Sequence, residues 1–402
     1  MSLFALDNAI DSLTERLSRV DCQTTAPSSG RALSTPIAAD RDSPAADVSA
    51  MDGYAVRIRD LSDGGPDRVP IAGEVQPGTA PVQLPPGAAL RIFTGAVIPM
   101  GAELVVKRED TIETPTEVAW SDAARRLPLG ANIRRQGENG RCGDSILPSG
   151  TVLTAASIAA AVNFGASQVS VFSRVKCSVI VTGNELLDVS ATPQPWQIRD
   201  SNGPTVAAMI NGHAWLQLAH SMRCGDDRDE LKVKLATAIA DSDAVILTGG
   251  VSKGDYDHVP EVIASLGGEI LFHRLPIRPG QPVLGAVTSS GKLILGLPGN
   301  PVSTACCMQR IGMPLLRRMG GHTDWRAQPS HVTVDNADDK TLPLVWMRLV
   351  RSIGYDAKSG TNRVEYVRSQ GSGDLVALGT SDGFVELPPG SKGPGPWPFY
   401  HW

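Results

Sequence analysis

Three loops between residues 243 and 303 combine glycines, carboxylates and arginines, the residue types that bind anions and metal ions. DAVILTGG leads into VSKGDYDHVP, GGEILF leads into HRLPIRPGQP, and KLILGLPGNPVST carries the third loop. Each loop follows an apolar run typical of a buried strand, and α/β proteins bind nucleotide-like ligands in such loops. Asp255 and Asp257 offer hard oxygen ligands, and Arg274 and Arg278 supply fixed positive charge. The segment therefore predicts an anionic, phosphorylated substrate together with a divalent metal.

Arg274 and Arg278 are four residues apart in RLPIRPGQP. On a helix this spacing would place both side chains on a solvated face, but Pro276 and Pro279 rule out a regular helix. We therefore expect a stiff loop that holds both guanidinium groups in place before binding. A guanidinium group fits phosphate, molybdate or another tetrahedral oxyanion through paired hydrogen bonds.

The loop TGNEL, residues 182–186, follows the apolar run CSVIV. Thr182, a glycine and Glu185 after a strand suit phosphate or metal binding. The alternative is a helix N-cap, in which Thr182 or Asn184 caps the backbone and Glu185 favours the helix dipole. The loop GGVSKGDYD could likewise be a simple turn. Its position after a continuous apolar run favours an anion-binding loop whose carboxylate, Asp257, holds Mg²⁺.

The elements that position these loops follow from the periodicity of the sequence. A chain of 402 residues predicts two to four domains. Near the N-terminus, Ile10, Leu13 and Leu17 share one face of a predicted helix. Short apolar runs split by Gly and Pro indicate β structure over 51–141, and 153–172 reads as a helix followed by a strand. From Lys176 onward apolar strands alternate with helices, which is typical of a parallel sheet covered on both faces. Beyond about residue 321 the pattern becomes β again.

The composition excludes several classes of protein. The formal charge of -5 and the pI near 5.8 argue against a nucleic-acid or membrane-surface protein. No apolar run reaches the roughly 18 residues of a bilayer-spanning helix, and the acidic N-terminal stretch is unlike a signal peptide. The six cysteines form no CxxC or zinc pattern. We therefore expect reduced thiols and a cytoplasmic protein.

Ten short motifs, taken together, are more specific than any one of them. SAMDGYAV, FTGAVIPMGAELVV, NIRRQGEN, GDSILPSGTVLT, VTGNEL, DSN, GGVSKGDYD, RPGQP, GLPGNPVS and QGSG occur in this order over residues 49–373. Their order and spacing resemble the MoeA family of molybdopterin molybdenumtransferases, which is related to the E domain of gephyrin. The resemblance covers nearly the whole chain.

The resemblance implies an α/β and β multidomain fold in an elongated subunit of four domains. A parallel-sheet molybdopterin-binding α/β domain is expected from residues 1–19 and 175–323, and a connector domain from 20–38 and 142–174. A β-rich inserted domain is expected over 39–141 and a C-terminal β-barrel-like domain over 324–402. The family further implies a homodimer, with a site between the α/β domain of one subunit and the β domains of the other.

The reaction implied by the resemblance is insertion of molybdate into the dithiolene of adenylylated molybdopterin, with release of AMP and a requirement for Mg²⁺. Asp52, Glu185, Asp226 and Asp257 match acidic positions of the family, although Asp227 competes with Asp226. We expect all four matched acids to be catalytic and the last three to be metal ligands. The residues expected to bind substrate are Thr94, Gly249, Gly250, Ser252, Arg274, Arg278, Pro298, Gly299, Asn300, Pro301 and Ser372.

The sequence departs from the family pattern at several positions. Asn184 and Asn139 stand where many members have a carboxylate, and Val48, Glu103 and Gln281 also differ. These changes leave open a non-catalytic protein that binds or delivers molybdopterin or the finished cofactor, or a tungstate-specific paralogue. A scaffold for partner proteins, as in gephyrin, has weaker support because no long linker is present. Molybdoenzymes or other cofactor-biosynthesis proteins are the partners that the resemblance suggests.

Overall fold

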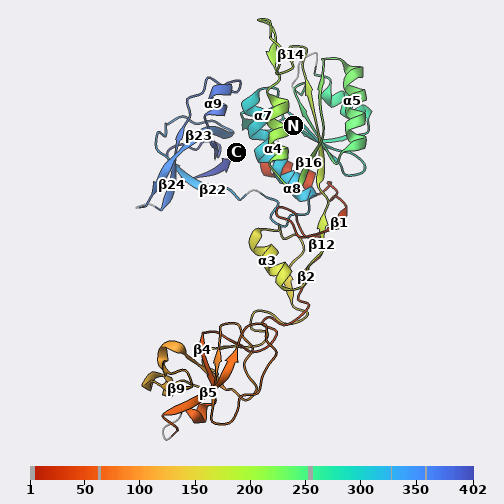
Figure 1. The fold of residues 1–402 in the computed structure, drawn as a ribbon. Coiled ribbons are helices and arrows are strands. Elements are labelled where there is room, and N and C mark those ends of the chain that lie inside the picture. The colour runs from red at the N-terminus through yellow and green to blue at the C-terminus, as the bar shows by residue number, and fades with distance from the viewer. Residues whose placement is uncertain (1–4, 62–64, 252–256, 327, 358–359) are drawn as a thin grey trace. The chain divides into compact units, whose positions relative to one another are not determined.

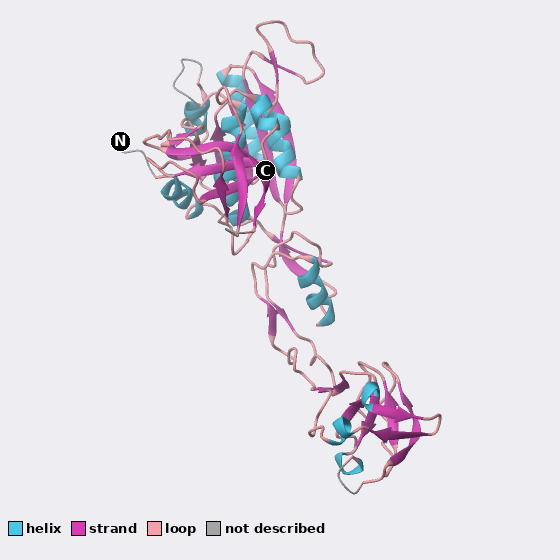
Figure 2. Cartoon of the chain, turned by 90° about the vertical axis from the view of Figure 1, so that its left-hand side faces the viewer, coloured by secondary structure: helices cyan, strands magenta, loops and turns pink. Residues whose placement is uncertain are grey.

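The computed structural model describes residues 5–61, 65–251, 257–326, 328–357 and 360–402. Two compact units make up the chain, and each is described by itself (Figures 1 and 2). The first unit consists of Met1–Thr35, Ser149–Ala155 and Gln168–Trp402, and the second of Pro36–Pro148 and Ala156–Ser167. The four domain boundaries expected from the sequence stay predictions. Among the described residues, no helix is both long and apolar enough to cross a membrane.

A six-stranded mixed sheet forms the centre of the first unit. Its order is β16 (Leu216–Cys224), β13 (Val175–Thr182), β17 (Ala244–Thr248), β21 (Leu293–Leu297), β20 (Leu284–Val287) and β18 (Glu269–His273). The first four strands are parallel, whereas β20 runs antiparallel to both of its neighbours. The sheet is therefore parallel except at β20. The connection from β18 to β20 is a ten-residue loop that contains β19 (Ile277–Arg278), which is shorter than the crossover of a dozen or more residues that a parallel pair needs.

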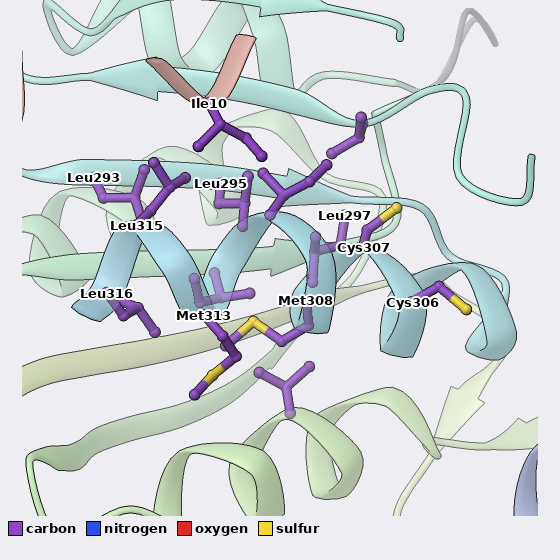
Figure 3. Close-up of a cluster of buried hydrophobic side chains, with 14 of the residues drawn as sticks. Ile10, Leu293, Leu295, Leu297, Cys306, Cys307, Met308, Met313, Leu315 and Leu316 are labelled. Carbon is purple, nitrogen blue, oxygen red and sulfur yellow. The ribbon is translucent and has the colours of Figure 1, made fainter. Parts of the chain in front are cut away.

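Helices cover both faces of this sheet, as the alternation of strands and helices predicts (Figure 1). One face carries α1 (Leu6–Thr14), α4 (Asn202–Asn211), α7 (Pro301–Cys307), the π-helical turn η3 (Met308–Gly312) and α8 (Met313–Met319), and the other carries α5 (Arg228–Asp241) and α6 (Val259–Ser265). Val179 and Val181 pack into the first core and Ile180 into the second, which explains why the strand is continuously apolar. Ile10 and Leu13 of α1 are buried as expected, and Figure 3 shows Ile10 in this core.

A closed five-stranded barrel forms the C-terminal part of the first unit. Its strands are β22 (Ser330–Val334), β23 (Val345–Asp356), β24 (Thr361–Tyr366), β25 (Gly383–Leu387) and β26 (Trp397–His401), with α9 (Leu375–Gly379) between β24 and β25. Pairing runs β23–β24–β22–β26–β25 and returns to β23, so the barrel leaves no open edge. The β-barrel-like domain expected from the sequence is confirmed. The short strand β19 (Ile277–Arg278) extends the barrel at β23.

A buried arginine links the α/β core to the barrel. Arg310, which is 8% exposed, donates to Glu386 at 2.6 Å and to Asp7 at 2.8 Å. Its guanidinium carbon lies 5.4 Å from the centroid of the Tyr400 ring. Burial alone would lower the pKa of Arg310, but the hydrogen bonds and charge of Glu386 outweigh burial and raise it. Three segments distant in sequence are therefore joined through one fully paired cation.

The second unit is built on a six-stranded sheet. Its order is β7 (Leu104–Lys107), β4 (Gly53–Val56), β6 (Ala89–Ile92), β5 (Arg68–Val75), β9 (Glu117–Trp120) and β8 (Thr111–Glu113). Tyr54 and Val56 enter one core while Ala55 enters the other, so β4 is buried on both faces. The β structure expected over 51–141 is present, with a short helix, α2 (Asp122–Arg125), and two 3-10 turns, η1 (Ile58–Asp60) and η2 (Arg108–Asp110).

Short paired strands and one helix complete the two units. The pairs are β1 (Cys22–Thr25) with β12 (Val169–Phe172), β2 (Ile37–Ala38) with β11 (Ser145–Leu147), β3 (Val48–Ser49) with β10 (Ile133–Arg134), and β14 (Leu186–Leu187) with β15 (Ile198–Arg199). The alanine-rich helix predicted after residue 153 is α3 (Ala155–Asn163).

Candidate functional site

The loops singled out in the sequence lie at one edge of the α/β sheet. Because β13, β16, β17 and β21 are parallel, their carboxyl ends share an edge. β18 is antiparallel to β20, which is antiparallel to β21, so the arginine loop after β18 leaves the sheet at the same edge. Ligands of α/β proteins bind outside the carboxyl ends of such strands. The prediction that these loops follow strands of an α/β sheet is confirmed.

Two glycines after β17 allow adjacent loops to approach closely. Gly249 and Gly250 have φ of 87° and 63°, in the left-handed region that favours glycine. A Cβ atom at Gly249 would lie 2.6 Å from the carbonyl oxygen of Thr182, which ends β13. A Cβ atom at Gly299 would lie 3.6 Å from the Cα of Gly249. The loops after β13, β17 and β21 are therefore packed backbone against backbone.

The TGNEL loop does not begin a helix, so the N-cap interpretation of that loop is wrong. Instead, Asn184 and Asp226 join two loops through reciprocal bonds. The Asn184 N–H donates to Asp226 Oδ2 at 3.2 Å, and the Asp226 N–H donates to Asn184 Oδ1 at 3.1 Å. An amide at position 184 makes this link without placing a second negative charge beside Asp226. Glu185 is exposed, and its carboxylate folds back toward Gly183.

The structure separates the roles of Asp226 and Asp227, which the sequence left open. Asp227 is the N-cap of α5 and accepts the Glu230 N–H at 2.7 Å. This bond fits a structural role for Asp227. Both acids line the same small pocket, to which Thr182, Gly250 and Val259 also contribute. The Asp226 carboxylate accepts the Asn184 N–H from the neighbouring loop instead of capping a helix. The capping role of Asp227 therefore favours Asp226 as the functional acid.

Asp257 lies just before α6, the helix whose first residue, Val259, lines the same pocket. Ser252 and Asp255 lie outside the described residues. Among the residues that are described, no group of three or more His, Cys, Asp or Glu side chains is arranged to hold a metal ion. The expected metal ligands Glu185, Asp226 and Asp257 therefore do not form a complete cage of protein ligands.

The arginine loop connects the sheet edge to the barrel. Ile277 and Arg278 pair with β23 as strand β19, so the prediction that no helix forms there is confirmed. Arg274 has φ of 78°, a left-handed conformation that costs energy for a residue with a side chain and is common at binding sites. In the part of the chain that the structure describes, neither Arg274 nor Arg278 forms an ion pair with a carboxylate.

The barrel reaches the loop after β21 through Ser372. The Asn300 side chain donates to Ser372 Oγ at 3.0 Å, and the Val302 N–H donates to the Ser372 carbonyl oxygen at 3.0 Å. Pro301 starts α7, a position that proline favours, and the Pro298 carbonyl oxygen accepts from Thr304 Oγ1 at 2.6 Å. The sequence expected Pro298, Gly299, Asn300 and Pro301 at this loop, and the same chain brings Ser372 to it.

Two residues of this edge were not among the predicted site residues. Asn202, which is 7% exposed, donates to the Gly299 carbonyl oxygen at 2.7 Å and so supports that loop. The sequence signal was the DSN motif, whose role is visible only once α4 and β21 are side by side. His273 Nε2 lies 2.7 Å from the Val251 carbonyl oxygen, which ties the end of β18 to the glycine loop. No sequence pattern indicates that contact.

Asp52 and Thr94 form a separate corner in the second unit. Asp52 Oδ1 accepts from both the N–H and the hydroxyl of Thr94, each at 2.8 Å. These two bonds, the backbone one first, hold the pKa of Asp52 below its ordinary value. The structure thus brings together the two residues that the sequence proposed in this unit.

A larger pocket in the second unit was not predicted. Its volume is about 520 Å³, and Arg91 and Glu113 contribute to its wall. Glu113 accepts hydrogen bonds from Arg91, Arg108 and Tyr54. The bond from Arg108, followed by that from Tyr54, lowers the pKa of Glu113 to about 2. These donors occupy the carboxylate of Glu113, so its role is to hold the sheet together.

Fold and site together define a class: a multidomain protein whose α/β domain presents glycines, carboxylates and arginines at one sheet edge, as suits an anionic phosphorylated ligand. Residues 4–165 match the family model of the MoeA N-terminal region (domain I and II), and residues 178–318 match that of a probable molybdopterin binding domain.

Known proteins resemble the chain over most of its length. A molybdopterin molybdenumtransferase of Nostoc sp. is 34% identical over 375 residues, which cover 90% of this chain and 83% of the relative. Another, from Synechococcus elongatus, is 36% identical over 296 residues, covering 71% of this chain and 72% of the relative. The crystal structure of a molybdopterin biosynthesis MoeA protein from Pyrococcus horikosii matches with a TM-score of 0.78 and 25% identity, covering 100% of this chain and 99% of that one. The chain belongs to the MoeA family and is a transferase of molybdenum cofactor biosynthesis.

Proposed function

We propose that the protein inserts molybdate into the dithiolene of adenylylated molybdopterin and releases AMP, in a reaction that requires Mg²⁺. One observation carries this proposal: the link between Asn184 and Asp226 that borders the pocket next to Gly250. The Asp226 carboxylate and two glycines with positive φ, Gly249 and Gly250, thus lie at the same edge of the sheet. The relatives of this protein are molybdopterin molybdenumtransferases.

The carboxylates at this edge are compatible with Mg²⁺. This ion keeps several waters and is usually bound by one or two protein carboxylates together with substrate phosphates. A complete protein cage is therefore not needed, and Asp226 and Asp257, with Glu185, are the proposed protein ligands. When bound, Mg²⁺ would neutralise charge on the phosphate oxygens.

The remaining residues are assigned to binding and orienting the substrates. Cleaving a phosphoanhydride depends on positioning and on neutralising charge more than on covalent help from the protein. We assign the backbone N–H of Gly250 to a phosphate, because the Gly249 N–H already donates to the Leu297 carbonyl oxygen. We assign Arg274 and Arg278 to the incoming oxyanion. Ser372 fixes the side chain of Asn300 at the loop after β21. We propose that Asp52, in the second unit, is catalytic and that Thr94 binds substrate.

Asn184 bears on the alternative of a non-catalytic binding or delivery protein. The missing carboxylate at this position was one reason to consider that alternative. In the structure, the Asn184 amide holds Asp226 in place, a function that a carboxylate could perform only with repulsion from Asp226. Asn139 likewise has a structural partner, because its Oδ1 accepts from Arg134 at 2.9 Å. Both departures therefore fit an enzyme.

The test incubates the purified protein with adenylylated molybdopterin, Mg²⁺ and molybdate and measures AMP. Release of AMP that depends on molybdate supports the enzyme. Tight binding of the pterin without AMP would identify a binding or delivery protein instead. A parallel arm with tungstate tests a tungstate-specific paralogue, which would release AMP faster with tungstate than with molybdate.

We also propose that the protein acts as a homodimer in the cytoplasm, with molybdoenzymes or other cofactor-biosynthesis proteins as partners. This part rests on the family. Sedimentation equilibrium of the purified chain checks the oligomeric state, and a monomer with full AMP release would contradict a shared site.

A further inference from the structure

Four arginines gather around Phe172 in the first unit. Arg31 donates to the Phe172 carbonyl oxygen at 2.6 Å, and the guanidinium carbon of Arg19 lies 5.6 Å from the centroid of the Phe172 ring. Arg174 follows two residues later in the chain. Arg318 lies in the last turn of α8, and its carbonyl oxygen accepts the N–H of Gly321, which packs against the Phe172 ring.

This arginine cluster, comprising Arg19, Arg31, Arg174 and Arg318, lies at the opposite edge of the sheet from the candidate site. Arg174 immediately precedes β13, and Thr182 ends that strand at the candidate site. At about 3.3 Å per residue, the two ends of β13 are separated by about 25 Å. A ligand at one edge therefore does not touch the other, and the cluster needs its own explanation.

The positive charge of the cluster is not offset by ion pairs with carboxylates. Elsewhere in this unit Arg16, Arg310 and Arg326 each form an ion pair with a carboxylate. Within the described ranges, none of the four clustered arginines does so. The protein carries a formal charge of -5, so a lack of acidic residues in the chain does not account for this arrangement.

The arginines also act on one another. The pKa of Arg318 is lowered by burial and then by the charge of Arg19, and the pKa of Arg31 is lowered by burial and then by the charge of Arg174. Like charges held close together in a partly buried setting are unfavourable unless an anion offsets them. The dipole of α8 favours cations in its last turn, but Arg19, Arg31 and Arg174 do not belong to that helix.

Two buried nitrogens of the cluster, Arg31 Nε and Arg318 Nη1, have no hydrogen-bond partner among the described residues. Arg31 is only 6% exposed, so its Nε is not simply solvated. A buried donor without a partner is unfavourable because nothing replaces the hydrogen bond that it made to water. Such donors beside uncompensated positive charge are what an anion-binding site presents before its ligand arrives.

We propose that the arginine cluster is a second oxyanion site, which binds a tetrahedral dianion of the phosphate and molybdate class. Arg19 and Arg174 are exposed and can reach the ligand directly, and Arg318 is half-buried beneath them. Guanidinium groups bind such anions through paired, charge-assisted hydrogen bonds. The inference is independent of the proposed function of the sheet edge.

The test measures binding of inorganic phosphate and, separately, of molybdate to the full-length protein by calorimetry at constant ionic strength. The double variant Arg19→Gln, Arg174→Gln removes the two exposed cations. A control, Arg68→Gln, removes an exposed cation of the second unit. Because phosphate can also bind at the sheet edge, every protein is measured in an Arg274→Gln background as well.

We expect saturable binding of at least one anion that persists in the Arg274→Gln background. The double variant should weaken this binding at least about tenfold, and Arg68→Gln should leave it unchanged. Hydrogen exchange should slow on anion binding in residues 19–31 and 317–322. Preference for phosphate or for molybdate identifies the source of the ligand. The proposal is overturned if neither anion binds saturably in that background, or if the double variant and the control weaken binding equally.

Discussion

Arg310 forms ion pairs with carboxylates, whereas the charged side chains at the carboxyl edge of the α/β sheet have few oppositely charged partners. Arg310 has two carboxylate partners and an aromatic ring, all inside the first unit. At the sheet edge, Asp226 is held by a backbone N–H, and Arg274 and Arg278 have no carboxylate partner among the described residues. Charge that is paired with opposite charge therefore stabilises this fold, whereas charge without an oppositely charged partner at the sheet edge is available to a ligand.

The largest effect is expected when an ion pair of Arg310 is broken. Glu386→Ala leaves Arg310 buried with one carboxylate fewer, and breaking a buried ion pair costs about 3–5 kcal/mol. We expect that loss in the free energy of unfolding, measured by urea denaturation, with AMP release intact while the protein remains folded. The control is Glu365→Ala, which removes the partner of the exposed Arg351 and should cost about 1 kcal/mol or less. Equal losses in the two variants would contradict the structural role of Arg310.

The next effect tests the close packing of the sheet-edge loops. Gly249→Ala places a methyl group 2.6 Å from the Thr182 carbonyl oxygen at a φ of 87°. Gly267→Ala makes the same change at a φ of 78°, with no atom within 4 Å of the new methyl group. We expect Gly249→Ala to be less stable than Gly267→Ala by about 2 kcal/mol in urea denaturation, because it adds a backbone clash to the same conformational cost. Similar stabilities would show that the loops can separate freely.

A smaller effect separates the two adjacent acids. Asp227→Ala removes the N-cap of α5 and should cost about 1 kcal/mol in thermal or urea unfolding. The rate of AMP release should stay within about twofold of the wild-type rate. Loss of AMP release in a folded Asp227→Ala protein would assign the functional carboxylate to Asp227 instead of Asp226.

The smallest effect concerns the Asp52 corner of the second unit. Thr94→Val removes the hydroxyl donor but keeps the backbone N–H, so the pKa of Asp52 should rise part of the way to its ordinary value. Side-chain NMR of both proteins measures this shift. Because the folded pKa is depressed, the stabilisation from Asp52 is present above its unfolded pKa and is lost as pH falls through the folded pKa. An unchanged pKa in Thr94→Val would show that the hydroxyl does not hold the carboxylate.

Much of the fold could be predicted because its signals are local. Continuous apolar runs such as CSVIVT predicted strands buried on both faces, and Val179, Ile180 and Val181 fill the two cores accordingly. The reversal of β20 could not be read in the same way. It depends on the ten-residue loop that follows His273 and pairs with the barrel through β19, and an apolar run carries no information on strand direction.

The sequence indicated residues of the candidate site but not the contacts between them. The order of motifs indicated Asn300, Ser372 and either Asp226 or Asp227, and the structure shows which groups touch. The link between Asn184 and Asp226 joins loops after two different strands, so only the assembled sheet reveals it. Arg310 gave no sequence signal, because a charged residue in a helical run is expected on the surface.

The most direct test of the account replaces Asp226 by Asn. The amide oxygen of Asp226→Asn can still accept the Asn184 N–H, so the loop pairing and the unfolding temperature should not change, while the negative charge is lost. We expect AMP release from adenylylated molybdopterin with Mg²⁺ and molybdate to fall about a hundredfold or more. AMP release at the unchanged rate in a folded Asp226→Asn protein would contradict the assignment of the sheet edge as the reactive site.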